Sequence, residues 1–338
     1  MTAGAAAGAG TPGVLTLTAV VVMPRGVDEL AGSLARLDAQ TCRDRIEVVL
    51  VHTPAHAHEI GAARFEHFWS FRAVTLAAVP TVATAFAAAC QVAAGDVVSL
   101  VEDHVLLDPG WAAAVLAAHC RCAAVAPLMA NANPATAISW ANFLSSFHEA
   151  IGGGAAGPVP CGPGHNTSYK REVLLRYGAE LQSLYQSERT FHYRLLRDGY
   201  AIWYSPDARL AHLNISRPRH ALRHAVLGGA LFGRYRSHGM GIAERLARTA
   251  GVPLVPLVRL TRILHAVRRA PVGSIPPAAW AMLGLLLVCH AVGEALGYWN
   301  LTAEIEAQYE FFELHRLECL RDEERALMLE GAPDLALG

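Results

Sequence analysis

Four short apolar runs alternate with segments of helical spacing over the first third of the chain, and this alternation limits the fold more than any other feature. The runs are residues 14–23, 46–51, 74–79 and 97–101. They are rich in β-branched residues, as buried strands are, and helices are predicted between them at residues 28–39 and 81–94. Because parallel strands need crossover connections, which are usually helical, the sequence predicts an α/β fold with a mostly parallel sheet flanked by helices.

The pattern continues less regularly to about residue 218. A Gly- and Pro-rich loop covers residues 152–164, and a helix is predicted at residues 188–197. From Arg217 onward the character changes: residues 216–271 hold eleven arginines and one acid, and residues 278–299 are strongly apolar. The expected organisation has three parts: a disordered leader at residues 1–13, a catalytic domain at 14–218 and a helical C-terminal region at 219–338.

Composition excludes several classes of protein. The formal net charge of −1 by itself argues neither for nor against a nucleic-acid partner, and none is expected. The seven cysteines are irregularly spaced without a Cys-x-x-Cys pair, which favours reduced, mostly buried thiols over disulfides or a zinc site. The Ala/Gly-rich leader lacks the basic segment and apolar core of a signal peptide, so we expect the catalytic domain to stay in the cytoplasm.

The strongest local signal is Glu102-Asp103-His104, which directly follows the fourth apolar run. Ligands of open parallel sheets bind beyond the carboxyl ends of the strands. Two carboxylates and an imidazole at that edge can hold a divalent cation, which in turn can hold a diphosphate. A polar strand end turning in solvent is the simpler alternative for these three residues.

Several ordered motifs together resemble family 2 glycosyltransferases with the GT-A fold, over about residues 14–218. The motifs are residues 20–24 (VVVMP), 37–41 (LDAQT), 100–104 (LVEDH), 107–111 (LDPGW), 163–171 (PGHNTSYKR), 187–188 (SE), 195–200 (LLRDGY), 206–208 (PDA) and His212. None of these motifs is specific alone; their order carries the resemblance. It implies a nucleotide-sugar transferase with a divalent cation, Mn²⁺ or Mg²⁺, as cofactor.

The resemblance also implies roles for single residues. Pro24, Glu102 and Asp103 would contact the donor nucleotide, Asp103 and His104 would bind the metal, and Glu188 would be the general base of an inverting reaction. A histidine ligand favours Mn²⁺ over Mg²⁺. The alternative for Glu188 is an acid that complements the dipole at a helix N-terminus.

Five further residues are candidates with equally ordinary alternatives. His212 is a possible third metal ligand or a hydrogen-bonded structural histidine. Gly164, His165 and Asn166 lie in a loop suited to an acceptor or a diphosphate, although Asn also serves turns. Trp140 is a candidate for stacking on a sugar, or a core residue.

Two departures from the family pattern concern the nucleotide. The second strand ends in His52-Thr53 where the family has a base-reading Asp, and residues 85–87 (AFA) replace the frequent Arg-Asn. These departures leave open a non-uridine donor, a lipid-phosphate sugar donor or a degenerate enzyme.

The C-terminal region predicts contact with a membrane. Its arginines would face anionic headgroups, and residues 250–267 mix apolar and arginine positions as interfacial helices do. Residues 278–299 are about long enough to span a bilayer; a buried helical hairpin is the alternative. The sequence thus predicts an inverting glycosyltransferase that serves a glycan or lipid-linked acceptor of the cell envelope or a polysaccharide. It would work at the cytoplasmic face of the inner membrane, bound peripherally or by a single hydrophobic segment. The alternative is a catalytically degenerate binding or scaffold protein. A nucleotidyltransferase is a weaker third candidate, since Pro24-Arg25-Gly26 only distantly resembles the basic loop it needs.

Overall fold

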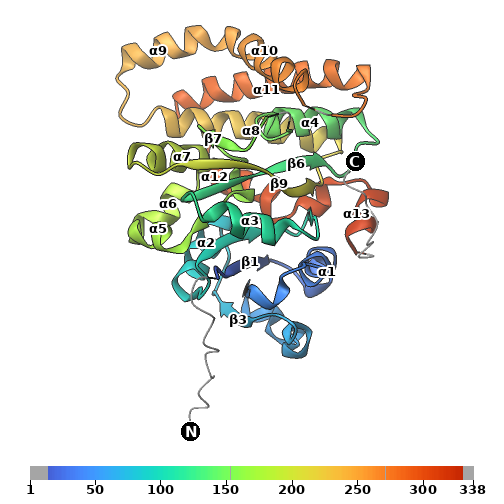
Figure 1. Ribbon diagram of the computed structural model, residues 1–338. Coiled ribbons are helices and arrows are strands. Elements are labelled where there is room, and N and C mark those ends of the chain that lie inside the picture. The colour runs from blue at the N-terminus through green and yellow to red at the C-terminus, as the bar shows by residue number, and fades with distance from the viewer. Residues whose placement is uncertain (1–13, 153, 271, 330–338) are drawn as a thin grey trace.

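The computed structural model describes residues 14–152, 154–270 and 272–329, so the predicted leader lies outside the described residues (Figure 1). Its first four strands are β1 Leu17–Met23, β2 Ile46–His52, β3 Ser70–Thr75 and β4 Val97–Val101. They pair in parallel in the order β3-β2-β1-β4. The strands β1, β2 and β4 are buried along their whole length, which is why they read as continuous apolar runs.

The third strand does not lie where the sequence pattern predicted it. It was expected at residues 74–79, but β3 starts at Ser70 and ends at Thr75. The strand lies at the edge of the sheet, half-exposed, and carries polar residues such as Arg72. Its position is set by pairing with β2, where Glu47 lies opposite Ser70, and not by an apolar run.

The second half makes the sheet mixed. Its strands are β5 Val105–Leu107, β6 Ala124–Asn131, β7 Gly157–Val159, β8 Ser168–Lys170 and β9 Ile202–His212. The short strands β8, β7 and β5 pair antiparallel to their neighbours, whereas β6 and β9 are parallel. The predicted α/β fold with helices on a sheet is confirmed, with antiparallel strands added in its second half.

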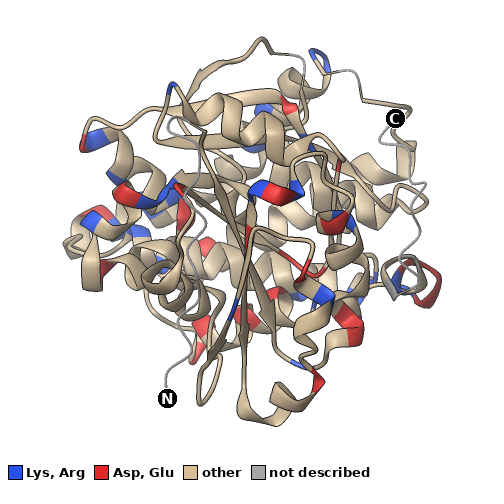
Figure 2. Cartoon of the chain, turned by 60° about the horizontal axis from the view of Figure 1, so that its bottom comes forward, with Lys and Arg blue, Asp and Glu red and all other residues tan. Residues whose placement is uncertain are grey.

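Helices cover both faces of this sheet. Those before residue 200 are α1 Ala31–Asp38, α2 Val82–Val92, α3 Trp111–His119, α4 Ala137–Phe147, α5 Arg171–Arg176, α6 Leu181–Tyr185 and α7 Glu188–Arg197. Thr81 and Thr136 accept hydrogen bonds from backbone N–H groups at the starts of α2 and α4, as N-cap residues do. Figure 2 shows that charged residues lie mainly on the helices and loops around the sheet.

The C-terminal region is helical, as predicted. Its helices are α8 Pro218–Arg236, α9 Ile242–Gly251, α10 Val255–Val267, α11 Pro277–Tyr298, α12 Ile305–Leu314 and α13 Asp322–Leu329. In Figure 1, α9 and α10 form the layer farthest from β1 to β3, and α11 lies between them and α8. Residues Ile242–Val267 and Pro277–Tyr298 are long and apolar enough to cross a membrane, by length and composition alone.

The α8 and α11 helices approach each other more closely than side chains normally allow. A Cβ atom added at Gly229 of α8 would lie 1.9 Å from the carbonyl oxygen of His290. One added at Gly293 of α11 would lie 2.0 Å from the carbonyl oxygen of Val226. Gly233 and Gly297 make equally close contacts one turn further on. These four glycines bring the two helix backbones together, so α11 is packed side by side with α8 and keeps one apolar face exposed.

The last described segment returns to the sheet. The α12 helix contacts α2 and α8, and α13 contacts α1. A short 3-10 helix, Arg316–Cys319, joins them, and its Glu318 pairs with Arg25 after β1. Residues 305–329 therefore lie across the edge where β1 and β4 end.

Candidate functional site

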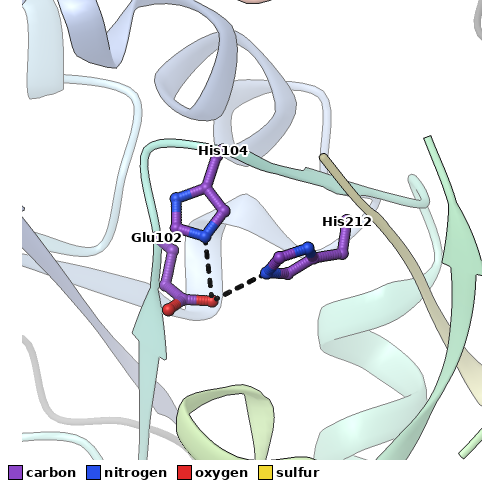
Figure 3. A group of neighbouring side chains, drawn as sticks. All are labelled: Glu102, His104 and His212. Atoms are coloured by element: carbon purple, nitrogen blue, oxygen red, sulfur yellow. Dashed lines mark ion pairs between the residues drawn. The ribbon is translucent and has the colours of Figure 1, made fainter. Parts of the chain in front are cut away.

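Three candidate metal ligands meet where β4, β5 and β9 come together. Glu102 follows the end of β4, and His104 immediately precedes β5. The pairing of Val105 with His212 brings the last residue of β9 beside His104. Glu102 Oε2 lies 3.8 Å from His104 Nε2 and 3.9 Å from His212 Nε2. Figure 3 shows both imidazole rings on the side of this carboxylate. One carboxylate oxygen and two imidazole nitrogens within such distances could hold a metal ion.

Hydrogen bonds on the far side of each imidazole turn Nε2 toward Glu102. His104 Nδ1 lies 2.7 Å from Asp103 Oδ1, and His212 Nδ1 lies 3.1 Å from Asn214 Oδ1. With Nδ1–H donating in both rings, each Nε2 keeps its lone pair. His104 Nε2 is buried and has no hydrogen-bond partner among the described residues, as expected for a nitrogen that faces a metal.

The charge states at the site suit a divalent cation. Burial would raise the pKa of Glu102, but His104, His165 and His212 outweigh it and lower that pKa to about 2. Burial, reinforced by His104, holds the pKa of His212 well below its ordinary value. An ionised carboxylate and a neutral imidazole are the forms that bind metal. The residues present therefore fit a divalent cation.

The predicted metal ligand Asp103 has a different position. Its carboxylate contacts the Nδ1 side of His104 and is outside the group of three. A second group, made of Glu102, His165 and Glu313, also has closely spaced oxygen and nitrogen atoms. His165 is unsuited to a metal because both of its nitrogens face carboxylates.

His165 connects the candidate metal ligand to the candidate base. Its Nδ1 lies 3.2 Å from Glu102 Oε1, and its Nε2 lies 2.6 Å from Glu188 Oε1. Burial opposes its charge, but Glu188, Glu102 and Glu313 together raise the pKa of His165 well above the ordinary value. His165 is thus a buried cation that donates to two carboxylates.

The loop at the start of β8 holds this arrangement. Gly164 has a φ of +21°, and a Cβ atom there would lie 3.3 Å from Glu188 Oε1. The neighbouring Asn166 donates from Nδ2 to Glu102 Oε2, over 2.9 Å. The predicted loop residues Gly164, His165 and Asn166 therefore do join Glu102 and Glu188 in one site.

A cavity of about 900 Å³ opens from this cluster toward the C-terminal helices. Glu102, Glu188 and His212 line its polar part, and residues of α8, α10 and α11 line the rest. Its volume lies in the range of small-molecule sites, which is about 300–1,000 Å³. The loop residues Gly164, His165 and Asn166 and the C-terminal region thus share one cavity.

The predicted nucleotide side is nearly closed. Pro24 and Asp103 border a separate hollow of only about 20 Å³, whose other side is formed by Glu313 and Leu314 of α12. Glu310 of the same helix accepts a hydrogen bond from the backbone N–H of Val82. A nucleotide cannot fit beside Pro24 unless this segment shifts.

Trp140 lies in the hydrophobic core, with 7% of its surface exposed and its ring 6.1 Å from that of Phe143. It is not among the residues that line the cavity. Its position matches the ordinary alternative of a core tryptophan.

Sequence reasoning missed Glu313 and Arg316. Glu313 Oε2 lies 3.6 Å from His165 Nδ1, and Arg316 Nη2 lies 3.1 Å from Glu313 Oε1. Burial opposes ionisation of Glu313, but Arg316 and His165 lower its pKa well below the ordinary value. Both residues sit in a stretch that reads as an acidic surface helix. The one feature of this stretch that indicates a buried helix face is the aromatic pair Phe311-Phe312.

Comparison with known proteins identifies the fold. No protein-family model matches the sequence, and no curated protein sequence is significantly similar to it. The mannosyltransferase PcManGT from Pyrobaculum calidifontis, in complex with GDP-Man and Mn²⁺, matches with a TM-score of 0.52 and 18% identity. That match covers 85% of this chain and 88% of the mannosyltransferase.

Two other glycosyltransferase structures match more weakly. GalNAc-T7 with UDP, GalNAc and Mn²⁺ has a TM-score of 0.45 at 14% identity, over 60% of this chain and 44% of its own. TarS of S. aureus has a TM-score of 0.44 at 14% identity, over 87% of this chain and 55% of its own. The chain thus spans about half the length of these two proteins. Its fold is GT-A-like, with the helical C-terminal region attached, which confirms the predicted fold.

Proposed function

We propose that this protein is a metal-dependent, inverting glycosyltransferase of the family 2 kind. It would move a sugar from an activated, nucleotide-diphosphate donor to an acceptor of the cell envelope or of a polysaccharide. The observation that carries the proposal is one cluster on a GT-A-like sheet. In that cluster, the carboxylate beside His104 and His212 is joined through His165 to Glu188. Residues 14–218 would form the catalytic domain and residues 219–338 the acceptor-side and membrane region.

Each residue of the cluster has a role in this reaction. A divalent cation on Glu102, His104 and His212 would offset the charge of the leaving diphosphate. Asp103 would orient His104 and not bind the ion itself. The PcManGT complex contains GDP-Man and Mn²⁺, which supports Mn²⁺ and a nucleotide donor for this chain.

Glu188 would take the proton of the acceptor hydroxyl. His165 already donates to Glu188 Oε1, so the proton would go to Oε2 as the acceptor oxygen bonds to the anomeric carbon. The bond from that carbon to the diphosphate oxygen breaks, and the diphosphate leaves with the bonding electrons. Attack opposite to the leaving group inverts the configuration. His165, held by three carboxylates, keeps Glu188 in place throughout.

The test is the substitution Glu188→Gln, which keeps the shape of the side chain and removes its basicity. Nucleotide sugars, GDP-mannose and UDP-sugars among them, are first titrated calorimetrically with Mn²⁺ or with EDTA. Transfer is then measured with the donor that binds. We expect Glu188→Gln to lower the rate by about 10²–10⁴-fold while donor affinity stays nearly unchanged.

The matched control is Glu180→Gln, since Glu180 is an exposed acid whose side chain is 66% accessible. If Glu188→Gln transfers sugar as fast as the control, Glu188 only complements the α7 dipole and the mechanism is wrong. Donor binding that EDTA leaves unchanged contradicts the metal site.

One observation favours the second candidate, a catalytically degenerate binding or scaffold protein. The hollow beside Pro24 is too small for a nucleotide while α12 covers it. This candidate predicts that no nucleotide sugar binds with Mn²⁺ at millimolar concentration, even though Mn²⁺ alone binds. Saturable donor binding excludes it.

We also propose that the protein acts at the cytoplasmic face of the inner membrane, held by its C-terminal helices. Ile242, Leu246, Leu254 and Leu257 are each more than half exposed on α9, the following turn and α10. Arg245, Arg248 and Arg262 lie among them, a pattern typical of helices in the headgroup region. The packing of α11 on α8 supports peripheral attachment over a spanning segment.

Sedimentation with vesicles tests the attachment. We expect the full chain to bind vesicles of phosphatidylglycerol and phosphatidylcholine, and Leu257→Asp to weaken binding. The control Val92→Asp alters an exposed apolar residue of α2 and should bind as the unmodified protein does. Equal binding by both variants would contradict the assignment of α10 as the contact surface.

A further inference from the structure

A second polar cluster lies in the same cavity as Glu188 and belongs to no part of the mechanism above. Arg189, next to Glu188 on α7, pairs through Nη2 with Glu149 Oε2 at 2.9 Å. Arg259 of α10 donates from Nη2 to the carbonyl oxygen of Ser145, also at 2.9 Å. His148 follows α4, and all three side chains line the cavity.

Two nitrogens of this cluster have unused hydrogen-bonding capacity. Arg259 Nη1 and His148 Nδ1 are both buried and have no hydrogen-bond partner within the described part of the chain. A buried donor without a partner is costly, and a charged one more so. A ligand oxygen that came within hydrogen-bonding distance of either nitrogen would satisfy it.

The electrostatics show which ligand charge is needed. Burial and the nearby Arg189 lower the pKa of Arg259 to about 10, so its guanidinium is still charged near neutral pH. Burial lowers the pKa of His148 to about 4, with Glu149 opposing and both arginines adding to the effect. The two acids nearby are engaged, since Glu149 pairs with Arg189 and Glu294 lies 3.6 Å from Arg236. The potential at Arg259 is positive and calls for an anion.

The surroundings indicate what the anion is attached to. Leu254, Val255 and Val258, on or just before α10, line the same cavity, as does Leu286 of α11. Leu254 and Val258 are 62% and 47% exposed, so this apolar wall continues to the surface proposed to meet the membrane. An anionic head beside Arg259 would have its apolar chain along α10.

We propose that Arg259, Arg189 and His148 bind the phosphoryl group of a lipid phosphate that serves as the acceptor. Glu188 takes the proton of its P–OH group as that oxygen bonds to the anomeric carbon, and the donor's diphosphate leaves with the bonding electrons. Arginine suits a phosphate because its planar fork donates two parallel hydrogen bonds. The role of this lipid as the acceptor depends on the proposed function. The binding site itself is inferred from the unpartnered nitrogens and the apolar wall alone. Arg189 sits one residue from Glu188, which places the bound head beside the proposed base.

The test uses the full chain and dihexanoyl phosphatidic acid, a lipid phosphate that is soluble as a monomer, titrated by calorimetry without donor. Inorganic phosphate and dihexanoyl phosphatidylcholine are the comparison probes. We expect the lipid phosphate to bind at least about 10-fold more tightly than either, because only it offers both an anionic head and an apolar chain.

Substitution then locates the site. Arg259→Gln should weaken lipid phosphate binding by about 10-fold or more, as expected for loss of a charged hydrogen bond, and Arg121→Gln, at an exposed arginine after α3, should not. If Arg259→Gln unfolds at a lower temperature than the unmodified protein, His148→Phe is the second variant, with the same weakening expected. Unchanged binding in the folded variants overturns the proposal, as does inorganic phosphate binding as tightly as the lipid.

The same experiment separates this proposal from the catalytic one. His104→Ala removes a metal ligand and should leave lipid phosphate binding unchanged. Competition between GDP with Mn²⁺ and the lipid phosphate would place the phosphate in the donor site and overturn the inference. Arg259-dependent lipid binding in a protein that transfers no sugar would leave this site standing and refute the glycosyltransferase proposal.

Discussion

The contact between α8 and α11 predicts a large effect of one methyl group. In Gly293→Ala the new Cβ atom would lie 2.0 Å from the carbonyl oxygen of Val226, whereas real Cβ atoms keep at least 3.0 Å. The obstacle is helix backbone, so the two helices must separate by about 1 Å. Such overpacking costs about 1–3 kcal/mol, with the upper end expected for an immovable backbone atom.

The matched control lies on the same helix. Gly284 has no atom within 4 Å of an added Cβ, so Gly284→Ala should gain about 1 kcal/mol from helix propensity alone. Both variants gain the same helix propensity. The difference of about 3 kcal/mol between their unfolding free energies is therefore the cost of the close contact at Gly293. At about 2 °C per kcal/mol for a chain of this size, their melting temperatures should differ by about 6 °C.

Thermal unfolding followed by tryptophan fluorescence measures this difference, both in detergent and on vesicles. If α11 instead crossed a bilayer apart from α8, both alanines would meet only lipid. Equal melting temperatures for Gly293→Ala and Gly284→Ala would therefore refute the packing of α11 on α8.

Two further predictions concern the metal site and α12. Asp103→Asn should weaken Mn²⁺ binding, measured by electron paramagnetic resonance, by about 10–100-fold, because the residue orients His104; unchanged affinity contradicts that role. Burial raises the pKa of Glu310 from 4.5 to about 7, so the folded chain keeps this proton where the unfolded chain loses it. Stability must then fall as pH rises from about 4.5 to 7, by up to about 3 kcal/mol, and Glu310→Gln should remove this loss. Urea unfolding of the unmodified protein and of Glu310→Gln at pH 5 and pH 7.5 measures this loss of stability. If the difference in unfolding free energy between the two proteins is the same at both pH values, the prediction is wrong.

The sequence predicted those parts of the molecule that depend on local pattern. The runs that became β1, β2 and β4 are buried on both faces, so their apolar character was visible, and Glu102 could be placed at a strand end. The β3 strand was misplaced because an edge strand carries polar residues. Glu188 was predicted at the start of α7, and α7 does begin there.

The parts that escaped prediction depend on contacts between distant segments. Glu313 and Arg316 reach the site only because residues 305–329 fold back across the sheet edge, and no periodicity reports where a helix docks. Asp103 was predicted as a metal ligand from its type and position, and the structure adds that its carboxylate contacts the Nδ1 side of His104. The close approach of α8 and α11 depends on four glycines whose alignment requires both helices in place.

The return of the α12 segment to the sheet has a consequence for synthesis of the chain. Glu313 and Arg316 emerge from the ribosome long after Glu102, His165 and Glu188, which they join in one cluster. Until then His165 lacks one of its three carboxylates, and the edge beside Pro24 stands open. A nascent or prematurely terminated chain would therefore lack two members of the cluster, although it contains Glu102, His104 and His212, the candidate metal ligands. Completion of the cluster therefore depends on docking of the C-terminal helices on the sheet.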